Sequence, residues 1–367
     1  MNTNRLLRLR NAMQQHKIDS IALTPGPSLS YLTGLHFHLM ERPVIGFFSS
    51  DGSIALLLPE LERIKADHMQ PEVRVFSYDE TAAGRENTFK DAAASLNLSG
   101  AVIGIEPLRC RAFELWLLQS VLIDSTYRDG TDLMSSIRVV KEAAEIEHLR
   151  QAVLIAEQAM EALLAQVKPG MTEKEIAAEL VIQLLRHGSE PELPFEPIVA
   201  TGPNSALPHA VPTNRKLQYG DLLLIDWGAR FAGYISDLTR TFAVGEVDPR
   251  LHELYQVVLE ANTKGRAISR PGITGAKIDA QTTDVLISAG YSELVRHRTG
   301  HGIGLEAHES PYISQDQHTP LQPGMAFTIE PGLYYPELGG VRIEDDMVLT
   351  DTGVESLSTI SREWRQL

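Results

Sequence analysis

The sequence predicts a mixed α/β protein of two domains, residues 1–136 and 137–367. Three observations predict this organisation. Short apolar runs alternate with helical patterns over the first 135 or so residues, one long helical pattern follows, and the remainder contains an internal repeat. A chain of 367 residues is long enough for two domains that each bury a core of their own.

The first domain contains five apolar runs that predict strands and three segments that predict helices. The predicted strands cover residues 18–23, 44–48, 53–58, 73–76 and 101–105. The predicted helices cover residues 1–18, 61–68 and 111–122. The first helix is expected to place Leu6, Leu7, Leu9 and Met13 on one side. This segment has basic residues and no acidic ones, as transit peptides do, but its apolar spacing favours a helix of the domain.

The second domain begins with a helical pattern over residues 137–167, which predicts a linker helix that ends at the KPG of 168–170. KPGMT at 168–172 recurs as RPGIT at 270–274, an offset of 102 residues. In each copy Pro-Gly ends one helix and the threonine caps the next, and TEKE at 172–175 is a full capping box. The capped helices are expected to end at Gly188 and Gly290, which keeps the same offset.

Each half of this repeat continues with a histidine and then two acids. The first half has His209, Asp226 and Asp237, and the second has His308, Glu330 and Glu344. The shared offset and the repeated order of functional groups predict a duplicated α/β half. Two halves related by a pseudo-two-fold axis would place their sites at a common centre.

Composition excludes several classes of protein. The formal net charge of −15 argues against sequence-independent nucleic-acid binding, which needs a basic surface. No apolar run approaches the roughly 18 residues that span a bilayer. Because Cys110 is the only cysteine and no signal sequence is recognisable, we expect no disulfide framework and a cytoplasmic location.

Residues 222–242 predict the first of two acidic hairpins. A turn near residues 231–232 would set Asp226 directly opposite Asp237. Opposed residues on one face of an antiparallel pair have Cβ atoms about 4.5–5.5 Å apart, so two buried carboxylates placed there would repel. Since Arg240 has the opposite parity and no Lys or Arg stands near the two acids on that face, a divalent cation is predicted.

Residues 326–350 predict a second hairpin, which turns around residues 336–339 and brings Glu330 towards Glu344. The four inward carboxylates of the two hairpins would be neutralised by two divalent ions. Pairs of metal ions held by carboxylates are a common hydrolytic device.

The stretch GHGIGLEAHES, residues 300–310, has glycine at alternate positions around His301. We expect a tight turn there that projects the imidazole inward as a fifth metal ligand, the only nitrogen among oxygens. An oxygen-rich set favours Mn²⁺, Co²⁺ or Fe²⁺ over Zn²⁺. His308, seven residues further on, is expected to lie too far away for the same ion and is assigned to the substrate. The stretch matches neither a phosphate-binding loop nor the HExxH motif.

Taken together, these segments resemble the pita-bread metallopeptidases, which include methionine aminopeptidase, aminopeptidase P and prolidase. The resemblance lies in SALPHA, LIDWGARFAGYISDLTRTF, TGHGIGLEAHESP, FTIEPGLYY and GGVRIEDD, and it covers about residues 140–367. SYLTGL and RVVKEAAEIEHLR are similar to the prolidase, aminopeptidase P and creatinase branch. The resemblance implies an N-terminal creatinase-like α/β domain followed by a C-terminal pseudo-two-fold pita-bread catalytic domain.

The resemblance also implies a dinuclear centre and a role for each ligand. Asp237 and Glu344 would bridge both ions, Asp226 would complete one of them, and His301 and Glu330 would complete the other. A water molecule between the ions would be the nucleophile, and Glu330 would shuttle its proton.

Three further residues are implied to act on the substrate. His209 and His308 would orient the scissile amide and stabilise the developing charge. Arg342, two residues before Glu344, would contact a neighbouring acid or the substrate carboxylate. One departure from the family pattern is Ala210, where prolidase-like members usually have glycine; its methyl group would narrow the pocket without removing a reacting group.

The implied activity is hydrolysis of the bond between an N-terminal residue and a following proline in a short peptide. An Xaa-Pro dipeptidase is slightly preferred over aminopeptidase P, and a creatinase-type C–N hydrolase or a non-catalytic scaffold should have lost metal ligands. Two ions, Mn²⁺ or Co²⁺ with Zn²⁺ or Fe²⁺ as alternatives, and a homodimer are expected. His36 and His38 are interpreted first as part of a polar loop of the first domain; the alternative hypothesis is that in such a dimer they reach the neighbouring subunit's site.

Overall fold

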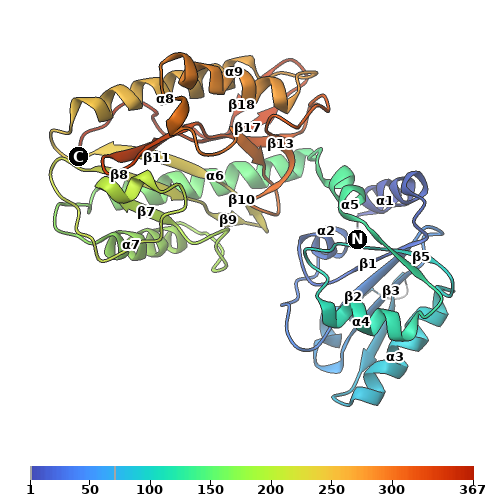
Figure 1. Ribbon diagram of the computed structural model, residues 1–367. Coiled ribbons are helices and arrows are strands. Elements are labelled where there is room, and N and C mark those ends of the chain that lie inside the picture. Colours follow the sequence, from blue (N-terminus) through green and yellow to red (C-terminus); the bar gives the residue numbers. More distant parts are fainter. Residues whose placement is uncertain (1, 70–71) are drawn as a thin grey trace. The chain divides into compact units, whose positions relative to one another are not determined.

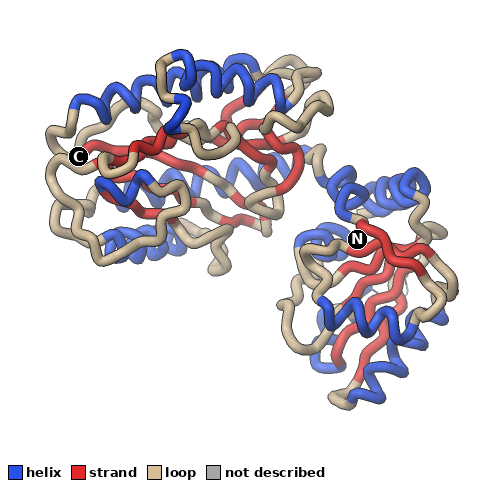
Figure 2. Tube along the Cα trace, viewed as in Figure 1, coloured by secondary structure: helices blue, strands red, loops and turns tan. Residues whose placement is uncertain are grey.

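The computed structural model describes residues 2–69 and 72–367. The chain forms two compact units that divide between Arg138 and Val139. Each unit has its own sheets and helices (Figures 1 and 2). In the described part of the chain, no helix combines the length and the apolar character needed to cross a membrane.

The N-terminal unit is built on a six-stranded sheet with the order β4-β3-β2-β1-β5-β6. Its strands are β1 (Ser20–Leu23), β2 (Ile45–Ser49), β3 (Ile54–Pro59), β4 (Arg74–Tyr78), β5 (Val102–Ile105) and β6 (Thr126–Asp129). The β1–β2 and β2–β3 pairs are antiparallel and the other pairs are parallel. The five predicted strands are confirmed, whereas β6 was missed because its sequence, TYRD, is largely exposed and has no apolar run.

The helices of this unit are α1 (Thr3–His16), α2 (Pro27–Thr33), α3 (Ala82–Ser95), α4 (Ala112–Val121) and α5 (Thr131–Arg138). Helix α1 buries Leu9, Ala12 and Met13, but Leu7, predicted on the same side, is 54% exposed. The predicted helix at 61–68 is instead two 3₁₀ helices, η1 (Glu60–Lys65) and η2 (Asp67–Met69). No residue of η1 is buried, so no packed face supports a regular α-helix there.

The linker helix predicted over residues 137–167 is interrupted. Helix α6 (Ala143–Leu164) begins only after Glu142, which forms a capping box with Glu145. In the residues before it, Val140 pairs with Met325, and the Lys141 N–H donates to the Gly324 carbonyl over 2.8 Å. This pairing with a distant segment, which helical periodicity does not encode, replaces the first turn of the predicted helix.

The internal repeat predicted in the C-terminal unit is confirmed. Helices α7 (Glu173–Arg186) and α9 (Gly275–Ser288) both contain 14 residues and both follow a threonine cap. The Gly170 N–H donates to Leu217, and the Gly272 N–H donates to Leu321, each over 2.8 Å. Each half pairs its capped helix with a preceding long helix, α6 in the first half and α8 (Pro249–Ile268) in the second.

The strands of this unit lie between its helices, with α8 and α9 along one side and α7 along the other (Figures 1 and 2). One sheet has the order β11-β8-β7 and another the order β13-β12-β14-β17-β18. These strands are β7 (Ile198–Thr201), β8 (Leu222–Trp227), β11 (Leu238–Ala243), β12 (Gly300–Gly302), β13 (Glu309–Ile313), β14 (Ala326–Ile329), β17 (Asp345–Leu349) and β18 (Val354–Ser356).

Two short ribbons complete the unit: β9 (Arg230–Phe231) with β10 (Tyr234–Ile235), and β15 (Gly332–Tyr335) with β16 (Gly339–Arg342). Two 3₁₀ helices, η3 (Gly202–Ala206) and η4 (Ser292–Leu294), lie in its loops. Thr239 forms an isolated bridge with Glu344, which joins the two halves at the place where their acids lie. Trp227, fully buried, donates from Nε1 to the Ala156 carbonyl over 2.9 Å and ties this sheet to α6.

Candidate metal and catalytic site

The first acidic hairpin turns one residue later than expected. Ala232 and Gly233, with φ values of 50° and 80°, form its tip, because Phe231 pairs with Tyr234. Asp226 therefore lies opposite Thr239, and the prediction that it directly faces Asp237 is wrong. Moving a turn by one residue changes the register by two, which preserves parity, so both acids remain on one face.

The second acidic hairpin has the predicted register. Gly332 pairs with Arg342, and Ile329 pairs with Asp345. The same register between these two pairs sets Glu330 opposite Glu344.

His301 lies in a strand, β12, rather than in the predicted turn. The glycines beside it allow close approach of neighbouring backbone. A Cβ atom on Gly300 would lie 2.0 Å from the Thr328 carbonyl oxygen, and one on Gly302 would lie 2.3 Å from that of Ser310. The glycines thus let β12 fit between β13 and β14, and the backbone pairing holds the imidazole in place.

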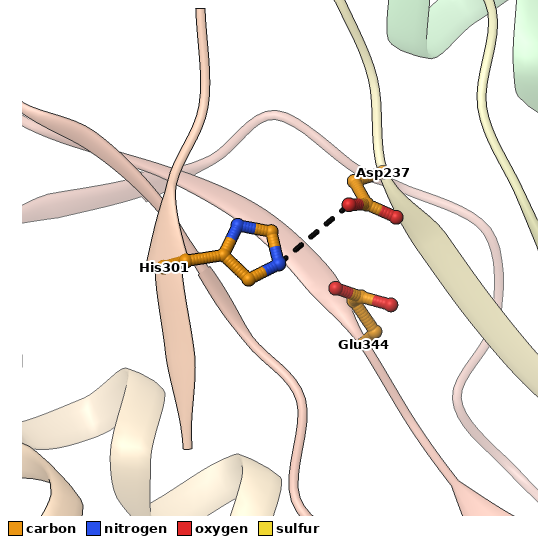
Figure 3. A group of neighbouring side chains, drawn as sticks. All are labelled: Asp237, His301 and Glu344. Atoms are coloured by element: carbon orange, nitrogen blue, oxygen red, sulfur yellow. Dashed lines mark ion pairs between the residues drawn. The ribbon is translucent and has the colours of Figure 1, made fainter. Parts of the chain in front are cut away.

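Three of the predicted ligands converge. Asp237, His301 and Glu344 each offer a donor atom within 4.8 Å of the others, and they project towards one another from separate segments (Figure 3). His301 Nε2 lies 3.7 Å from Asp237 Oδ2 and 3.3 Å from Glu330 Oε1. Four of the five predicted ligands therefore share one small volume.

The electrostatics of this volume favour a cation. Burial raises the pKa of Asp237 and of Glu344 well above the carboxyl range, and neighbouring carboxylates raise both further. Burial raises the pKa of Glu330 to about 7, against the effect of Arg342. Burial lowers the pKa of His301 well below its usual value, so the imidazole is neutral at neutral pH and can donate its lone pair to a metal.

Asp226, the fifth predicted ligand, pairs with Arg342. Arg342 Nη2 lies 2.6 Å from Asp226 Oδ2. The sequence of the first hairpin predicted no cation on this face, because Arg342 comes from the second hairpin. Within the described part of the chain, Asp226 Oδ1 is buried and has no hydrogen-bond partner. One oxygen of Asp226 thus remains available for a metal ion.

The two remaining histidines line the same cavity, whose volume is about 660 Å³. The ring centroid of His308 lies 4.2 Å from that of His301, so the two rings are in contact. The two histidines thus lie closer together than their separation in the sequence predicted. His209 is exposed and follows η3. Apolar side chains, including Phe195, Ile198 and Val211, form another wall of the cavity.

Three residues at the site, His297, Arg298 and Tyr334, were not predicted from the sequence. His297 Nε2 lies 2.7 Å from the Tyr334 hydroxyl, which also accepts from Arg342 Nη1 over 2.7 Å. Burial, and then Arg342, lowers the pKa of His297 to about 4. Arg298 lines the cavity. The position of His297 four residues before His301 is the one signal in the sequence that could have drawn attention to it.

Comparisons with known proteins agree with this geometry. Residues 147–351 match the model of metallopeptidase family M24, and residues 5–140 match the creatinase/prolidase N-terminal domain. The chain belongs to metallopeptidase family M24. The fold class expected from sequence, a creatinase-like α/β domain followed by a pita-bread catalytic domain, is confirmed, and the protein is a metallopeptidase.

This M24 metallopeptidase is similar to several characterised relatives. It is 34% identical over 364 residues to the Xaa-Pro dipeptidase of Pyrococcus furiosus, covering 98% of this chain and 99% of that one. A dipeptidase structure from Pyrococcus horikoshii superposes with a TM-score of 0.94 at 36% identity, over 99% of this chain and 100% of that one. An X-Pro aminopeptidase structure from Thermotoga maritima gives a TM-score of 0.85 at 30% identity, over 99% of each chain.

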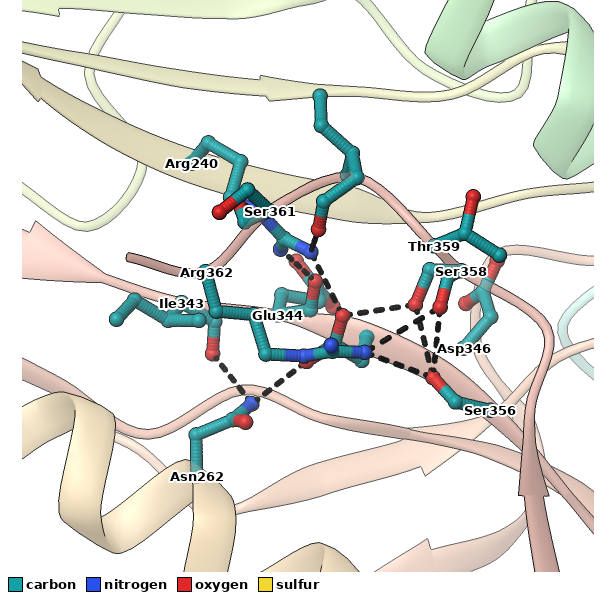
Figure 4. A network of polar contacts seen from close by, with 12 residues as sticks. Arg240, Asn262, Ile343, Glu344, Asp346, Ser356, Ser358, Thr359, Ser361 and Arg362 are labelled. Atoms are coloured by element: carbon teal, nitrogen blue, oxygen red, sulfur yellow. Dashed lines mark hydrogen bonds and ion pairs between the residues drawn. The ribbon is translucent and has the colours of Figure 1, made fainter. Parts of the chain in front are cut away.

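In this M24 chain a buried polar network holds the two ligand-bearing hairpins together (Figure 4). Arg240 Nη1 donates to the Glu344 carbonyl over 2.6 Å, and its Nη2 donates to Asp345 Oδ1 over 2.8 Å. Asp345 also accepts from Asn262 over 3.0 Å and from Arg362 over 2.6 Å. Because Arg240 lies on β11 and Asp345 on β17, the network fixes the distance between the segments that carry Asp237 and Glu344.

The donors of the site fit divalent cations. Carboxylate oxygens dominate, one neutral imidazole nitrogen accompanies them, and Asp226 supplies a buried oxygen without a partner. Burial of several like charges is unfavourable without counter-charge, and Arg342 alone supplies too little.

Proposed function

We propose that this metallopeptidase is an Xaa-Pro dipeptidase with two divalent metal ions. The observation that carries the proposal is the convergence of buried carboxylates and His301 in one cavity of a chain that resembles Xaa-Pro dipeptidases along its whole length. We assign residues 1–136 to the creatinase/prolidase-like domain and residues 137–367 to the catalytic domain.

In this proposal the two ions would be held by Asp226, Asp237, His301, Glu330 and Glu344. The oxygen-rich set favours Mn²⁺ or Co²⁺, with Zn²⁺ or Fe²⁺ as alternatives. Bound ions would polarise the scissile carbonyl and make water a stronger nucleophile at neutral pH.

The protein's own groups would bind the substrate and move protons. Glu330 would take the proton of the attacking water and deliver it to the prolyl nitrogen, which must be protonated to leave. His308 and His209, which line the same cavity, would hold the scissile amide and stabilise the developing oxyanion. Arg342 would position Asp226 rather than touch substrate, since its guanidinium already pairs with that acid.

The apolar wall of the cavity suits the prolyl ring of the substrate. Phe195, Ile198 and Val211 line the same cavity as His209. A pyrrolidine ring has no hydrogen-bond donor of its own, so apolar surface is the appropriate partner.

Hydrolysis of Ala-Pro beside Ala-Pro-Ala by manganese- or cobalt-loaded protein tests this function. We expect rapid cleavage of the dipeptide, little cleavage of the tripeptide, and two metal ions per chain by elemental analysis. Rapid cleavage of the tripeptide would assign the chain to the aminopeptidase type, and inertness towards both would refute an Xaa-Pro specificity.

We further propose a homodimer in the cytoplasm, in which His36 and His38 of one subunit reach the neighbouring site. Both histidines are exposed. Replacing both with alanine should raise KM for dipeptides without altering metal content. Unchanged kinetics, or a monomer in analytical ultracentrifugation that retains full activity, would contradict this arrangement.

A further inference from the structure

The cavity is lined by two arginines, Arg298 and Arg342, whose partners differ completely. Arg342 forms hydrogen bonds with other residues of the protein. It donates to Asp226 over 2.6 Å, to the Tyr334 hydroxyl over 2.7 Å, to Thr239 Oγ1 over 3.0 Å and to the Pro208 carbonyl over 3.3 Å. Four of its five N–H donors are therefore taken within the protein.

Arg298 has no such partner. Its guanidinium lies over the Tyr312 ring, 4.6 Å from the centroid, and forms no hydrogen bond or ion pair with any residue that the structure describes. A guanidinium stacked on an aromatic face keeps its N–H groups directed outward in its own plane. The donors of Arg298 are therefore free to meet an anion in the cavity.

The peptide group that follows Arg298 is held at both of its polar atoms, which fixes the backbone from which the side chain extends. The neighbouring Thr299 N–H donates to Asp279 Oδ1 over 2.9 Å, and the Arg298 carbonyl lies 2.8 Å from His297 Nδ1. The backbone of Tyr312 is also held, because this residue belongs to β13 and its carbonyl oxygen packs against Gly275, where an added Cβ atom would lie only 2.3 Å away.

The substrate supplies the anion that this cation needs. A dipeptide carries a free carboxylate one residue beyond the scissile bond, whereas a longer peptide has a neutral amide there. The acidic residues of the cavity would repel a carboxylate, so its binding requires a cation that they have not already taken. Of the two arginines in the cavity, Arg342 already has a carboxylate partner, Asp226, whereas Arg298 has no acidic partner among the described residues.

We infer that Arg298, held on the face of Tyr312, binds the free carboxylate of the substrate's C-terminal residue and so selects dipeptides over longer peptides. This assignment rests on the proposed dipeptidase function and deepens it. Arg298 is a specificity residue: the carboxylate takes no part in the bond changes, so the interaction is equal in the ground state and the transition state.

The test measures two proteins, wild type and a variant, on two substrates, with and without the carboxylate. Arg298→Gln is compared with wild type on Ala-Pro and on Ala-Pro-amide, which lacks the carboxylate charge. Losing a hydrogen bond to a charged group should raise KM for Ala-Pro by about 20-fold and leave kcat nearly unchanged. KM for Ala-Pro-amide should be the same in both proteins. Arg296→Gln, an exposed arginine two residues earlier that does not line the cavity, is the matched control and should behave as wild type.

Two further variants separate charge and stacking from general damage. Arg298→Lys should recover part of the affinity for Ala-Pro, and Tyr312→Phe, which keeps the ring, should lose less affinity than Tyr312→Leu. An equal loss on both substrates, or no loss on either, would overturn the assignment of Arg298. Failure of wild-type protein to cleave Ala-Pro would instead refute the proposed function, so the two failures are distinguishable.

Discussion

The guanidinium of Arg342, on β16, lies 2.6 Å from Oδ2 of Asp226, on β8, and this ion pair joins the two halves of the C-terminal unit. Both side chains are largely buried. The pair therefore holds a predicted metal ligand in orientation from the opposite half. Its strength can be measured separately from the metal.

Replacing Arg342 with methionine should destabilise the metal-free protein. Breaking a buried pair leaves an uncompensated charge and costs about 3–5 kcal/mol. Urea denaturation in EDTA measures the loss, and added Mn²⁺ should recover part of it because the ion supplies the missing positive charge. We also expect kcat/KM to fall by about 100-fold, since Asp226 loses its orientation. Arg365→Gln, which breaks an exposed pair with Glu161, is the control; equal losses in both variants would contradict this role.

Metal binding should release protons. Glu330 has a pKa of about 7 in the metal-free protein, raised first by burial, so it is mostly protonated at pH 6.5, while the neutral His301 has no proton to lose. Calorimetric titration with Mn²⁺ at pH 6.5, in two buffers of different ionisation enthalpy, should detect release of at least about one proton per chain. Binding without proton release would show that the carboxylates are already ionised.

The raised pKa of Glu330 also determines how the stability of the metal-free protein changes with pH. Between the ordinary carboxyl pKa of 4.5 and about 7, Glu330 binds more protons in the folded state than in the unfolded state. Its contribution to the stability of the metal-free protein therefore falls as pH rises through this window, by on the order of 3 kcal/mol. The stabilisation gained on adding metal should accordingly increase from pH 5 to pH 8, as measured by denaturation with and without Mn²⁺.

Replacing Glu173 with glutamine should disturb the segment that carries His209. The buried Glu173 carboxylate accepts from the Thr201 N–H over 2.7 Å and from the Thr213 N–H over 2.9 Å, so it fixes both ends of residues 202–212. We expect a loss of about 1–3 kcal/mol in stability and a fall in kcat/KM with metal content unchanged.

The control for Glu173 is the same substitution at Glu175, two residues further along α7. Glu175 is exposed and serves only the capping box with Thr172. Its replacement should slightly lower stability and leave the kinetics as in wild type. Equal kinetic losses in the two variants would show that the helix, rather than the His209 segment, is responsible.

Replacing Gly300 with alanine should damage both fold and site. The added methyl group would lie 2.0 Å from the Thr328 carbonyl oxygen, and this backbone atom cannot move without parting β12 from β14. A loss of about 3 kcal/mol or more in stability is expected, together with displaced His301 and weaker metal binding. Gly353→Ala, where no atom lies within 4 Å of the added Cβ, should be tolerated in the same denaturation assay.

Local signals predicted much of the fold and of the site. Pro-Gly and threonine caps placed α7 and α9 and revealed the repeat, and apolar runs located five strands of the N-terminal unit. Asp226 and Asp237 lie on the same face of the hairpin as predicted, although the turn was placed one residue too early. Parity depends on the alternation of strand residues, which sequence spacing records directly.

Other features depended on contacts between distant segments. The partner of Asp226 proved to be Arg342 of the other half, and Glu173 proved to fix the His209 segment. Pairing of β12 with β13 and β14 placed His301 in a strand. A bridge between Val140 and Met325 replaced the first turn of the predicted linker helix.

The sequence by itself thus determined which chemical groups each half contributes, the capped helices α7 and α9, and the face on which the acids of each hairpin lie, because caps and strand alternation act over a few residues. The tertiary structure alone decided which of those groups meet: Arg342 with Asp226, His301 with His308, and Arg298 with Tyr312. Arg342 meets Asp226 because the two halves pack around a common centre, whereas the other two pairs meet because β12 pairs with β13 within the second half.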